Sequence, residues 1–522
     1  MAIILWIALS FAAAAAAAQQ SCESLTSLKL PYTTVTSAAM VPEGPFTEGA
    51  RPNTTPPTAP ARCVVKAIAR PTSDSEIKFE LWMPPAGAWN GKYRQTGNGG
   101  WAGEVPVQAL VPALKLGYAT AGTDDGHEGG GAAFAIGHPE KLIDFGHRAV
   151  HETSVQSKLI MRAFYGKVPA RSYFVGCSDG GREALMEAQR YADDFDGIVA
   201  GAPANDWSHH FTGFVWNEQA LLKEAGSSIP VAKLPVLQAA VLAACDALDG
   251  LKDGLIEDPR ACKFNPGVLT CKDGDGPGCL TAAQVEAVRK IYAGPTNPRT
   301  GKQIYPGYPP GTEAAPGTWN PWITPASAEK AIQFNFGNTY YGQAVFEDPN
   351  WDFRKLNFDS DVEFGDRKAG VHLNSNSPDL RSFRGRGGKL IQYHGWGDAA
   401  ISAYSSIDYY ESVKAFHSRF PDGRTDSSKP IQDFYRLFMV PGMGHCGGGL
   451  GPNNLDAFGA LERWVENGVA PEKIIGTGAI AGDRTKKMTR PLCVYPQVAR
   501  YKGSGDPNDA ESFHCGIPGD KR

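Results

Sequence analysis

The chain has 522 residues, and 42% of them are hydrophobic, which is enough for one large domain with a sizeable insertion or for two domains. Its 51 basic and 55 acidic residues give a net charge of −4, and no run of five or more like charges occurs. Because binding to a phosphate backbone needs a basic surface, this composition argues against a nucleic-acid partner.

The first predicted element is a signal peptide at residues 1–18. Ile3 to Ala18 is an unbroken run of apolar and small residues, shorter than the roughly 20 residues that a membrane span needs. No Lys or Arg precedes the run, so a short N-terminal anchor remains the alternative. No second apolar run of comparable length follows. We therefore expect a secreted or periplasmic protein with no membrane span in the mature chain.

Residues 63 to about 200 alternate between strand and helix patterns. Apolar alternation or compact apolar runs predict strands at 77–83, 93–96, 117–123 and 172–175. Helical spacing of apolar residues predicts helices at 147–165 and 182–191. Strands that alternate with helices indicate a mostly parallel sheet with crossover helices, which is an α/β fold.

The pattern changes between residues 205 and 385, where Pro, Gly and Trp residues and Asp-Gly turns become dense. It resumes with a strand at 389–394, a helix at 407–416, a strand at 433–440 and a helix at 454–467. We therefore predict one sheet domain, made of residues 19–204 and 386–522, interrupted by an insertion at 205–385.

Ten cysteines follow the predicted signal peptide, and no two of them have the C-x-x-C spacing of zinc or redox sites. An even number of cysteines in an exported chain is most simply explained by five disulfides. Three pairs lie close in sequence and suggest local crosslinks. The ten are Cys22, Cys63, Cys177, Cys245, Cys262, Cys271, Cys279, Cys446, Cys493 and Cys515.

A nucleophile elbow is the first motif that carries chemistry. Gly176-Cys177-Ser178-Asp179-Gly180 follows a predicted strand and precedes a predicted helix, which is the context that the G-x-S-x-G motif requires. The turn is so tight that its flanking residues must be small, and it holds the Ser178 Oγ clear of the sheet. In a chain with 60 glycines, an ordinary turn is the alternative.

An acid and a base follow Ser178 in the order that α/β-hydrolases use. Asp398 comes just after the predicted strand at 389–394, and His445 lies in a Gly-rich loop after the strand at 433–440. We predict that His445 takes the Ser178 proton and that Asp398 fixes the His445 tautomer and stabilises the imidazolium. By itself, His445 is more often a hydrogen-bonded loop residue.

Two cysteines flank this predicted triad. Cys177 precedes Ser178 and Cys446 follows His445, so a disulfide between them would tether the nucleophile to the base. It would close a loop of about 270 residues, and long loops gain the most in the chain-entropy model. Two buried free thiols are the alternative.

Two further sites are predicted from short motifs. The backbone N–H of Asp179 and one from Gly99 or Gly100 are candidates for an oxyanion hole, because glycines let the backbone approach a ligand. An ordinary Gly-rich turn at 97–100 is the alternative.

Carboxylates and carbonyls in one loop suggest a calcium site. The side chains of three aspartates, at spacings of three and four, could share one cation with two backbone carbonyls, an oxygen set suited to Ca²⁺. These residues are Asp246, Asp249, Leu251, Asp253 and Leu255. The spacing is not that of an EF-hand, and Asp-Gly turns on the surface are the alternative.

Taken together, these motifs resemble the tannase and feruloyl esterase family of α/β-hydrolases, which also contains the terephthalate monoester hydrolase. The resemblance covers nearly the whole mature chain. It rests on the adjacent Cys–Ser and His–Cys pairs in residues 176–182 and 444–446, and on His394-Gly395-Trp396-Gly397-Asp398. The resemblance implies an α/β-hydrolase fold in which the insertion is a lid domain.

The resemblance also implies a structural Ca²⁺ in the lid loop and a disulfide pattern. The pairs would be Cys177–Cys446, Cys22–Cys63, Cys245–Cys262, Cys271–Cys279 and Cys493–Cys515. Family members hydrolyse esters of aromatic acids, chiefly galloyl and feruloyl esters. We therefore expect a serine carboxylic ester hydrolase whose substrate is a small or polysaccharide-linked phenolic ester.

Three other functions remain open. The terephthalate monoester hydrolase holds a carboxylate with a lid Arg, but residues 311–353 contain no Arg and only Lys330 as a basic residue. A general carboxylesterase or lipase is the second alternative, although no long apolar lid helix is evident. The third is a secreted binding protein on a hydrolase scaffold, which would have no need to keep the triad.

Nine aromatic residues lie close together in the predicted lid, and they bear on the substrate. Aromatic rings offer flat, rigid walls for a phenolic ring. We expect at least six to form the core of the lid and one or two to face Ser178. The nine are Trp319, Trp322, Phe334, Phe336, Tyr340, Tyr341, Phe346, Trp351 and Phe353.

Overall fold

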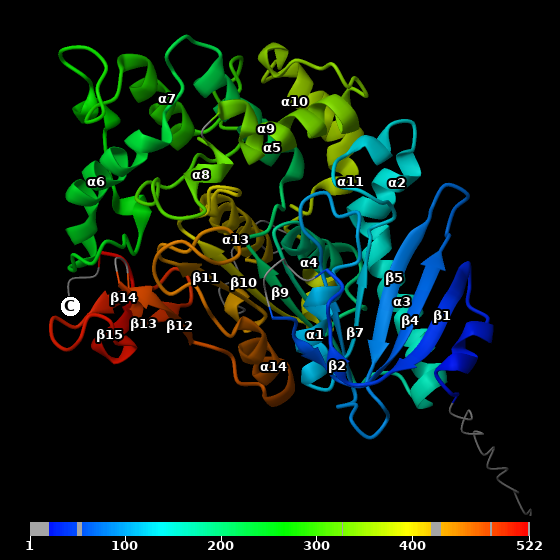
Figure 1. The fold of residues 1–522 in the computed structure, drawn as a ribbon. Helices are drawn as coiled ribbons and strands as arrows, with labels where there is room; N and C mark the ends of the chain where they lie inside the picture. The colour runs from blue at the N-terminus through cyan, green and yellow to red at the C-terminus, as the bar shows by residue number, and fades with distance from the viewer. Residues whose placement is uncertain (1–19, 50–54, 326, 419–429, 481–482, 520–522) are drawn as a thin grey trace, which may run out of the picture.

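The computed structural model describes residues 20–49, 55–325, 327–418, 430–480 and 483–519. The predicted signal peptide at 1–18 lies outside these residues. The described chain forms a large sheet flanked by helices, with a mainly helical body over one edge of the sheet (Figure 1).

The main sheet has nine strands in the order β1-β4-β5-β7-β6-β8-β9-β10-β11. All pairings from β7 to β11 are parallel, while β1, β4, β5 and β7 pair antiparallel. The parallel part confirms the α/β prediction, but the antiparallel edge was not predicted. The strands are β1 Thr33–Val41, β4 Arg62–Ala69, β5 Ile77–Met83, β6 Lys92–Thr96, β7 Ala119–Thr123, β8 Arg171–Cys177, β9 Gly197–Gly201, β10 Lys389–Gly395 and β11 Tyr435–Val440.

Helices cover both faces of this sheet. One face is covered by α3 (Ala149–Tyr165), α4 (Asp179–Arg190) and α13 (Ala403–His417), which share a core with the strands. The other face is covered by α1 (Val107–Lys115) and α14 (Ala457–Asn467). Two of the predicted helices begin at different residues. Helix α4 begins at Asp179 rather than 182, and α3 is preceded by a π-helical turn, Asp144–Arg148.

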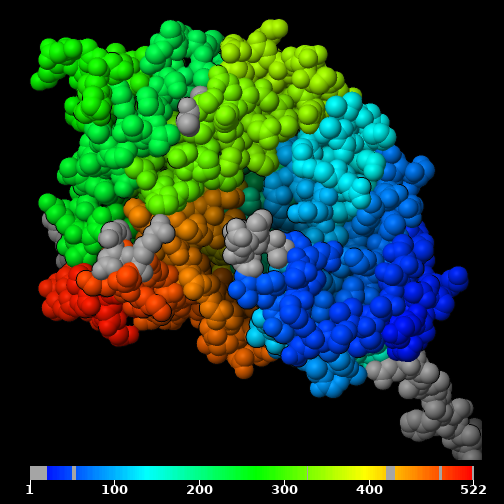
Figure 2. Space-filling model, viewed as in Figure 1, coloured from blue at the N-terminus to red at the C-terminus, as the bar shows by residue number. Residues whose placement is uncertain are grey.

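The residues predicted to be a turn-rich insertion are largely helical. Their helices are α5 Trp207–Leu222, α6 Leu234–Cys245, α7 Ala282–Ala293, α8 Trp319–Trp322, α9 Ile332–Thr339, α10 Ser360–Gly365, α11 Val371–Leu373 and α12 Arg381–Gly385. Coloured green to yellow, α5 to α11 lie together with the short α2 (Pro139–Ile143) over the sheet, and they form one continuous mass on the molecular surface (Figures 1 and 2). Near the end of this segment, Leu380 and Phe383 are buried in the core of the sheet.

Small two-stranded sheets lie at the two ends of the chain. Near the C-terminus, β12 (Lys473–Ile480) pairs with β13 (Asp483–Cys493), and β14 (Val498–Tyr501) pairs with β15 (Phe513–Gly516). Near the N-terminus, β2 (Gly44–Pro45) pairs with β3 (Thr58–Ala59). All five expected disulfides are present, with the predicted pairing.

One apolar helical stretch escaped the sequence analysis, which predicted no second run of this kind. Val231–Asp249 has the length and composition of a membrane span, judged on the described residues alone. Alanines make it less conspicuous than a run of Leu or Ile. It is no clear span, because Leu234, Leu237 and Val241 pack into a core shared with α7, and Cys245 is bonded to Cys262.

Candidate active site

Ser178 occupies a strained turn between β8 and α4. Its backbone has φ 68° and ψ −121°, in the left-handed half of conformational space that side chains rarely adopt. Close contacts explain the neighbouring glycines. A Cβ added at Gly176 would lie 2.2 Å from the Gly180 carbonyl oxygen, and one at Gly181 would lie 2.3 Å from that of Gly201. The turn has the geometry that the sequence predicted for a nucleophile elbow.

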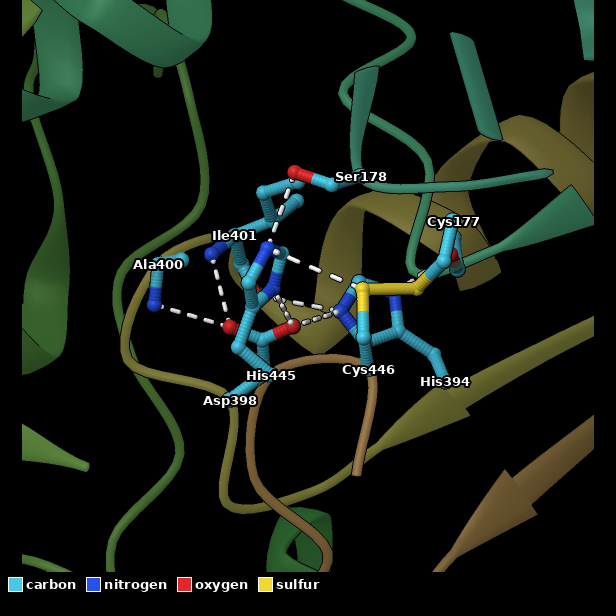
Figure 3. Close-up of a disulfide and its surroundings, with 9 residues drawn as sticks. Cys177, Ser178, His394, Asp398, Ala400, Ile401, His445 and Cys446 are labelled. Carbon is cyan, nitrogen blue, oxygen red and sulfur yellow. Dashed lines mark hydrogen bonds and ion pairs between the residues drawn. A yellow bond between two sulfur atoms is a disulfide. The ribbon is translucent and has the colours of Figure 1, made fainter. Parts of the chain in front are cut away.

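The three predicted triad residues meet at the carboxyl edge of neighbouring parallel strands. Ser178 follows β8, Asp398 follows β10, and His445 follows β11. The Nε2 atom of His445 lies 2.8 Å from the Ser178 Oγ, and its Nδ1 atom lies 2.8 Å from the Asp398 Oδ2 (Figure 3). Both distances are those of hydrogen bonds, so the side chains are connected in the order that proton transfer from Ser178 requires.

Asp398 is 2% exposed and is held by several N–H groups. The backbone amides of Ala400 and Ile401 donate to Oδ1, at 2.8 Å and 2.9 Å. Oδ2 lies 2.8 Å from His445 Nδ1 and 3.2 Å from His394 Nε2. Burial alone would raise the pKa of Asp398, but the charge of His445 and the contacts with both imidazoles hold it well below its usual value. The acid is therefore ionised at neutral pH.

A disulfide joins the two loops that carry Ser178 and His445. Cys177 and Cys446 are bonded across a sequence separation of 269 residues (Figure 3). Cys446 has a φ of 58°, so the loop turns sharply just after His445. The bond ties the end of β8 to the loop after β11 and limits how far the two side chains can separate.

The candidate oxyanion donors lie beside Ser178. Gly99, Gly100 and Asp179 all line the same cavity as Ser178 and His445. Within the described chain, the backbone amides of these three residues donate no hydrogen bond to the protein. The carbonyl of Asn98 accepts the N–H of Gly180, which fixes the glycine loop against the start of α4. These three N–H groups are therefore unpaired in the described chain, and their residues border the cavity that Ser178 lines.

This cavity has a volume of about 290 Å³ and is mostly apolar. Of the nine aromatic residues singled out in the predicted lid, Trp322 and Phe336 line it. The Trp322 ring also meets the His445 ring edge to face, at a centroid distance of 5.2 Å. The other seven aromatics belong to the core under the insertion or pack against it.

Helix α5 supplies a wall of the cavity that the sequence analysis missed. Trp207, His210, Phe211 and Phe214 line the cavity from one side of this helix. Their spacing of three, one and three residues places all four on one helical face, and this pattern could have revealed them. The remaining wall comes from Ala204, Ala400, Ile401 and the Cys177–Cys446 disulfide.

A buried group of carboxyls behind Ser178 was also missed. Side-chain oxygens of Asp125, Asp179 and Glu183 all lie within 4.8 Å of one another, and each residue is at most 2% exposed. Arg182, 0% exposed, forms an ion pair with Asp179 at 2.5 Å. Arg182 and Glu183 lie three and four positions after Asp179 in α4, so this helical spacing was the available signal.

The predicted calcium loop has the right donor atoms, although its three aspartates do not form a group as tight as the one behind Ser178. Asp246, Asp249 and Asp253 each accept backbone N–H groups of the same loop. The second carboxylate oxygen of Asp253, Oδ2, pairs with Arg490 at 2.7 Å. In the described chain, the carbonyls of Leu251 and Leu255 accept no backbone hydrogen bond. Carboxylates with spare lone pairs and two free carbonyls suit a hard cation, so the residues fit Ca²⁺.

Comparison with known proteins decides the family. A family model described as tannase and feruloyl esterase matches residues 63–516. The chain belongs to this family. An uncharacterized esterase of Xanthomonas campestris is 43% identical over 96% of this chain and 92% of its own length. The mono(2-hydroxyethyl) terephthalate hydrolase of Piscinibacter sakaiensis is 32% identical, covering 96% of this chain and 92% of its own.

A solved structure agrees with the tannase and feruloyl esterase assignment. The structure of feruloyl esterase B from Aspergillus oryzae has a TM-score of 0.84 and 30% identity, and covers 95% of this chain and 99% of its own. These matches confirm the predicted α/β-hydrolase fold and the predicted class of enzyme. The protein is an ester hydrolase of the tannase and feruloyl esterase family.

Proposed function

We propose that this enzyme hydrolyses carboxylic esters of neutral aromatic acids, with Ser178 as nucleophile, His445 as base and Asp398 as the orienting acid. One observation carries the proposal: the hydrogen-bonded series Ser178–His445–Asp398 opens into a cavity walled by aromatic rings. A pocket of this size and lining suits one planar ring, and the Ser178 Oγ is at hand for its ester carbonyl.

The geometry supports a two-step reaction. His445 Nε2 accepts the Ser178 proton as Oγ attacks the ester carbon, and Asp398 stabilises the imidazolium that forms. The amides of Asp179 and of Gly99 or Gly100 stabilise the negative oxygen of the tetrahedral intermediate. His445 then gives the proton to the departing alcohol, which leaves an acyl group on Ser178. Water activated by His445 releases the acid and restores the serine.

The lining of the cavity favours an uncharged acyl group. Among the described residues that line it, the ionisable ones are Asp179, His210 and His445, and no Lys or Arg is present. Burial lowers the pKa of His210 to about 4, so this ring is neutral at pH 7. A free carboxylate on the acyl ring would therefore find no cation, which disfavours a terephthalate-type substrate. Feruloyl and galloyl groups are the neutral aromatic acyl groups that we propose.

The protein is proposed to work outside the cytoplasm with a structural Ca²⁺. Five disulfides support an extracellular or periplasmic location. Asp246, Asp249 and Asp253, with the carbonyls of Leu251 and Leu255, would hold the ion and crosslink the loop that follows α6. The segment 205–385 would act as the lid that carries both this loop and the aromatic wall.

A panel of esters tests the substrate proposal. We expect kcat/KM for methyl ferulate or methyl gallate to exceed that for an alkyl ester of similar size by roughly 10–200-fold, the range that apolar pockets supply. The mono(2-hydroxyethyl) ester of terephthalate should be a poorer substrate than either. Ser178→Ala serves as the blank. Equal or better activity on the alkyl ester would identify a general carboxylesterase instead.

A further inference from the structure

A buried series of polar side chains lies behind Asp398, on the side away from Ser178. His394, the second-last residue of β10, is 0% exposed. Its Nε2 atom lies 3.2 Å from the Asp398 Oδ2 and 3.1 Å from the Ile401 carbonyl oxygen, as Figure 3 shows. Its Nδ1 atom lies 2.7 Å from the Ser406 Oγ. Both ring nitrogens therefore have fixed partners.

These partners determine which nitrogen of His394 carries the proton. A carboxylate and a carbonyl oxygen can only accept, so the Nε2 atom must donate. On the other side, the Gln392 amide donates to the Ser406 Oγ at 2.6 Å, and the Ser406 hydrogen is left for Nδ1. The Tyr435 hydroxyl donates to the Gln392 carbonyl oxygen and so orients the amide. This direction of donors makes His394 a neutral ring with its proton on Nε2.

We infer that His394 is a positioning residue for the reaction, which rests on the proposed function of Ser178, His445 and Asp398. It gives a second N–H to the carboxylate oxygen that orients His445. With the amides of Ala400 and Ile401 on the other oxygen, the Asp398 carboxylate then accepts four N–H groups. A carboxylate has about four acceptor positions, so the acid is saturated and cannot turn.

The N–H of His394 also reduces the negative charge that Asp398 presents to His445. An N–H from His394 draws on the negative charge of Asp398 and weakens its hold on protonated His445. Removing this donor should strengthen that hold and loosen the geometry of the acid. Protonated His445 would then persist to higher pH, where it cannot act as a base.

Other titratable groups near Asp398 will not obscure this effect. His210 of α5 faces the same loop and donates to the Ala400 carbonyl, and burial lowers its pKa to about 4. Tyr305 and Tyr308 approach from the insertion, and burial raises the pKa of both hydroxyls well above the usual value. None of these three changes charge between pH 5 and pH 9. Burial raises the pKa of Asp179, beside Ser178, to about 7, so the shift of the acidic limb is read as the difference between His394→Phe and wild type, which share Asp179.

The experiment compares His394→Phe, which keeps a ring without a donor, with His394→Gln, whose amide can still donate. We expect kcat/KM of His394→Phe to fall roughly tenfold to hundredfold, as for loss of a hydrogen bond to a charged group. Its acidic limb should move to higher pH, while KM changes little because His394 does not line the cavity. His394→Gln should restore most of the rate and the position of the limb.

Three outcomes overturn the inference or its basis. A wild-type rate and acidic limb in folded His394→Phe contradict the role of His394, provided that Ser178→Ala is inactive. Activity in Ser178→Ala instead contradicts the proposed function itself. If His394→Phe does not fold, nitrogen-15 NMR of histidine-labelled wild type decides, with His394→Gln used for assignment. We expect a proton on Nε2 and none on Nδ1, and the reverse refutes the inference.

Discussion

Two buried carboxylate environments flank Ser178, and they differ in how their charge is balanced. Asp398 accepts N–H groups on both oxygens, and its pKa lies well below the usual value. Behind the nucleophile, burial raises the pKa of Asp179 to about 7, and burial together with Glu183 raises that of Asp125. Both regions are almost fully buried. The charge of His445 and the contacts with both imidazoles outweigh burial at Asp398, whereas burial outweighs the Arg182 ion pair at Asp179.

The three carboxyls behind Ser178, those of Asp125, Asp179 and Glu183, receive too few hydrogen bonds to stabilise three negative charges. Asn98 donates to one oxygen of Asp125 and one of Glu183, and Arg182 pairs with one oxygen of Asp179. The other oxygen of each carboxyl has no partner among the described residues. A proton kept by Asp125 can instead bridge to Glu183. The fold is therefore stabilised while these carboxyls keep their protons, and it loses stability when rising pH removes them.

Replacing one carboxylate in each region should give the largest contrast in activity. We expect Asp398→Asn to lower kcat by roughly 10⁴-fold, because the amide favours the wrong tautomer of His445. Asp125→Asn, outside the cavity, should retain most of the activity. Steady-state kinetics on methyl ferulate checks both, with Ser178→Ala as the blank. A loss below tenfold in Asp398→Asn would remove Asp398 from the triad.

The disulfide that joins the loops of Ser178 and His445 offers the next test. Replacing Cys177 and Cys446 together by Ala should lower kcat roughly tenfold to hundredfold, because a small displacement of His445 is costly. The distal pair Cys493–Cys515 provides a matched control, and its double Ala variant should keep kcat while losing stability. Equal kcat losses in the two variants would show that Cys177–Cys446 has no special link to catalysis.

The calcium loop is a third group of carboxylates, and there a cation would take the place of protons or N–H donors. We expect EDTA to lower Tm by roughly 5 °C or more, with recovery on adding Ca²⁺, because an ion that binds only the native state stabilises it. Asp249→Asn should lose most of this response. Elemental analysis that finds no calcium in folded protein would refute the site.

The smallest expected effect is on stability and depends on pH. Burial and Glu183 raise the pKa of Asp125 well above its usual value of 3.8, so this carboxyl stabilises the fold fully below pH 3.8 and loses that contribution as pH rises through its raised folded pKa. Asp125→Asn should therefore raise Tm by roughly 2 °C at pH 8 and leave it unchanged at pH 4. Asn also tolerates the φ of 59° at this position.

Asp398→Asn should show the opposite sign. Its pKa is depressed in the folded state, so its contribution is present above about pH 4 and is lost as pH falls further. This variant should lose stability at pH 8 rather than gain it. Thermal melts of both variants at pH 4 and pH 8 make the comparison. A gain in both at pH 8 would mean that relief of burial outweighs the donors around Asp398.

The sequence was sufficient where chemistry depends on a local turn. The nucleophile elbow, the acid after β10 and the base after β11 are short motifs at strand ends, and parallel strands bring their carboxyl ends to one edge. The disulfide pairing followed from family resemblance. Roles for Ser178, Asp398 and His445, the oxyanion donors and Ca²⁺ stay predictions, to be tested by activity and metal analysis.

The sequence could not predict contacts between strands and side chains that lie far apart along the chain. Antiparallel β1 and β4 contain polar and small residues, so their edge of the sheet has no strong apolar pattern. The aromatic face of α5 carries a helical signal, but Pro, Gly and Trp residues nearby made the whole segment look irregular. Asp125 joins Asp179 only through tertiary contact across β7 and α4, and no spacing rule links them.

The order of the strands along the chain has a consequence for production of the enzyme. Strand β9 pairs with β10, but the whole insertion is synthesised between them. At about 5–20 residues per second, a ribosome needs roughly 10–40 s to cover that stretch. During this interval the nascent chain presents β9 as an open edge, on which another chain can add a strand. Chains truncated within the insertion keep this edge permanently, and they are expected to aggregate in any host.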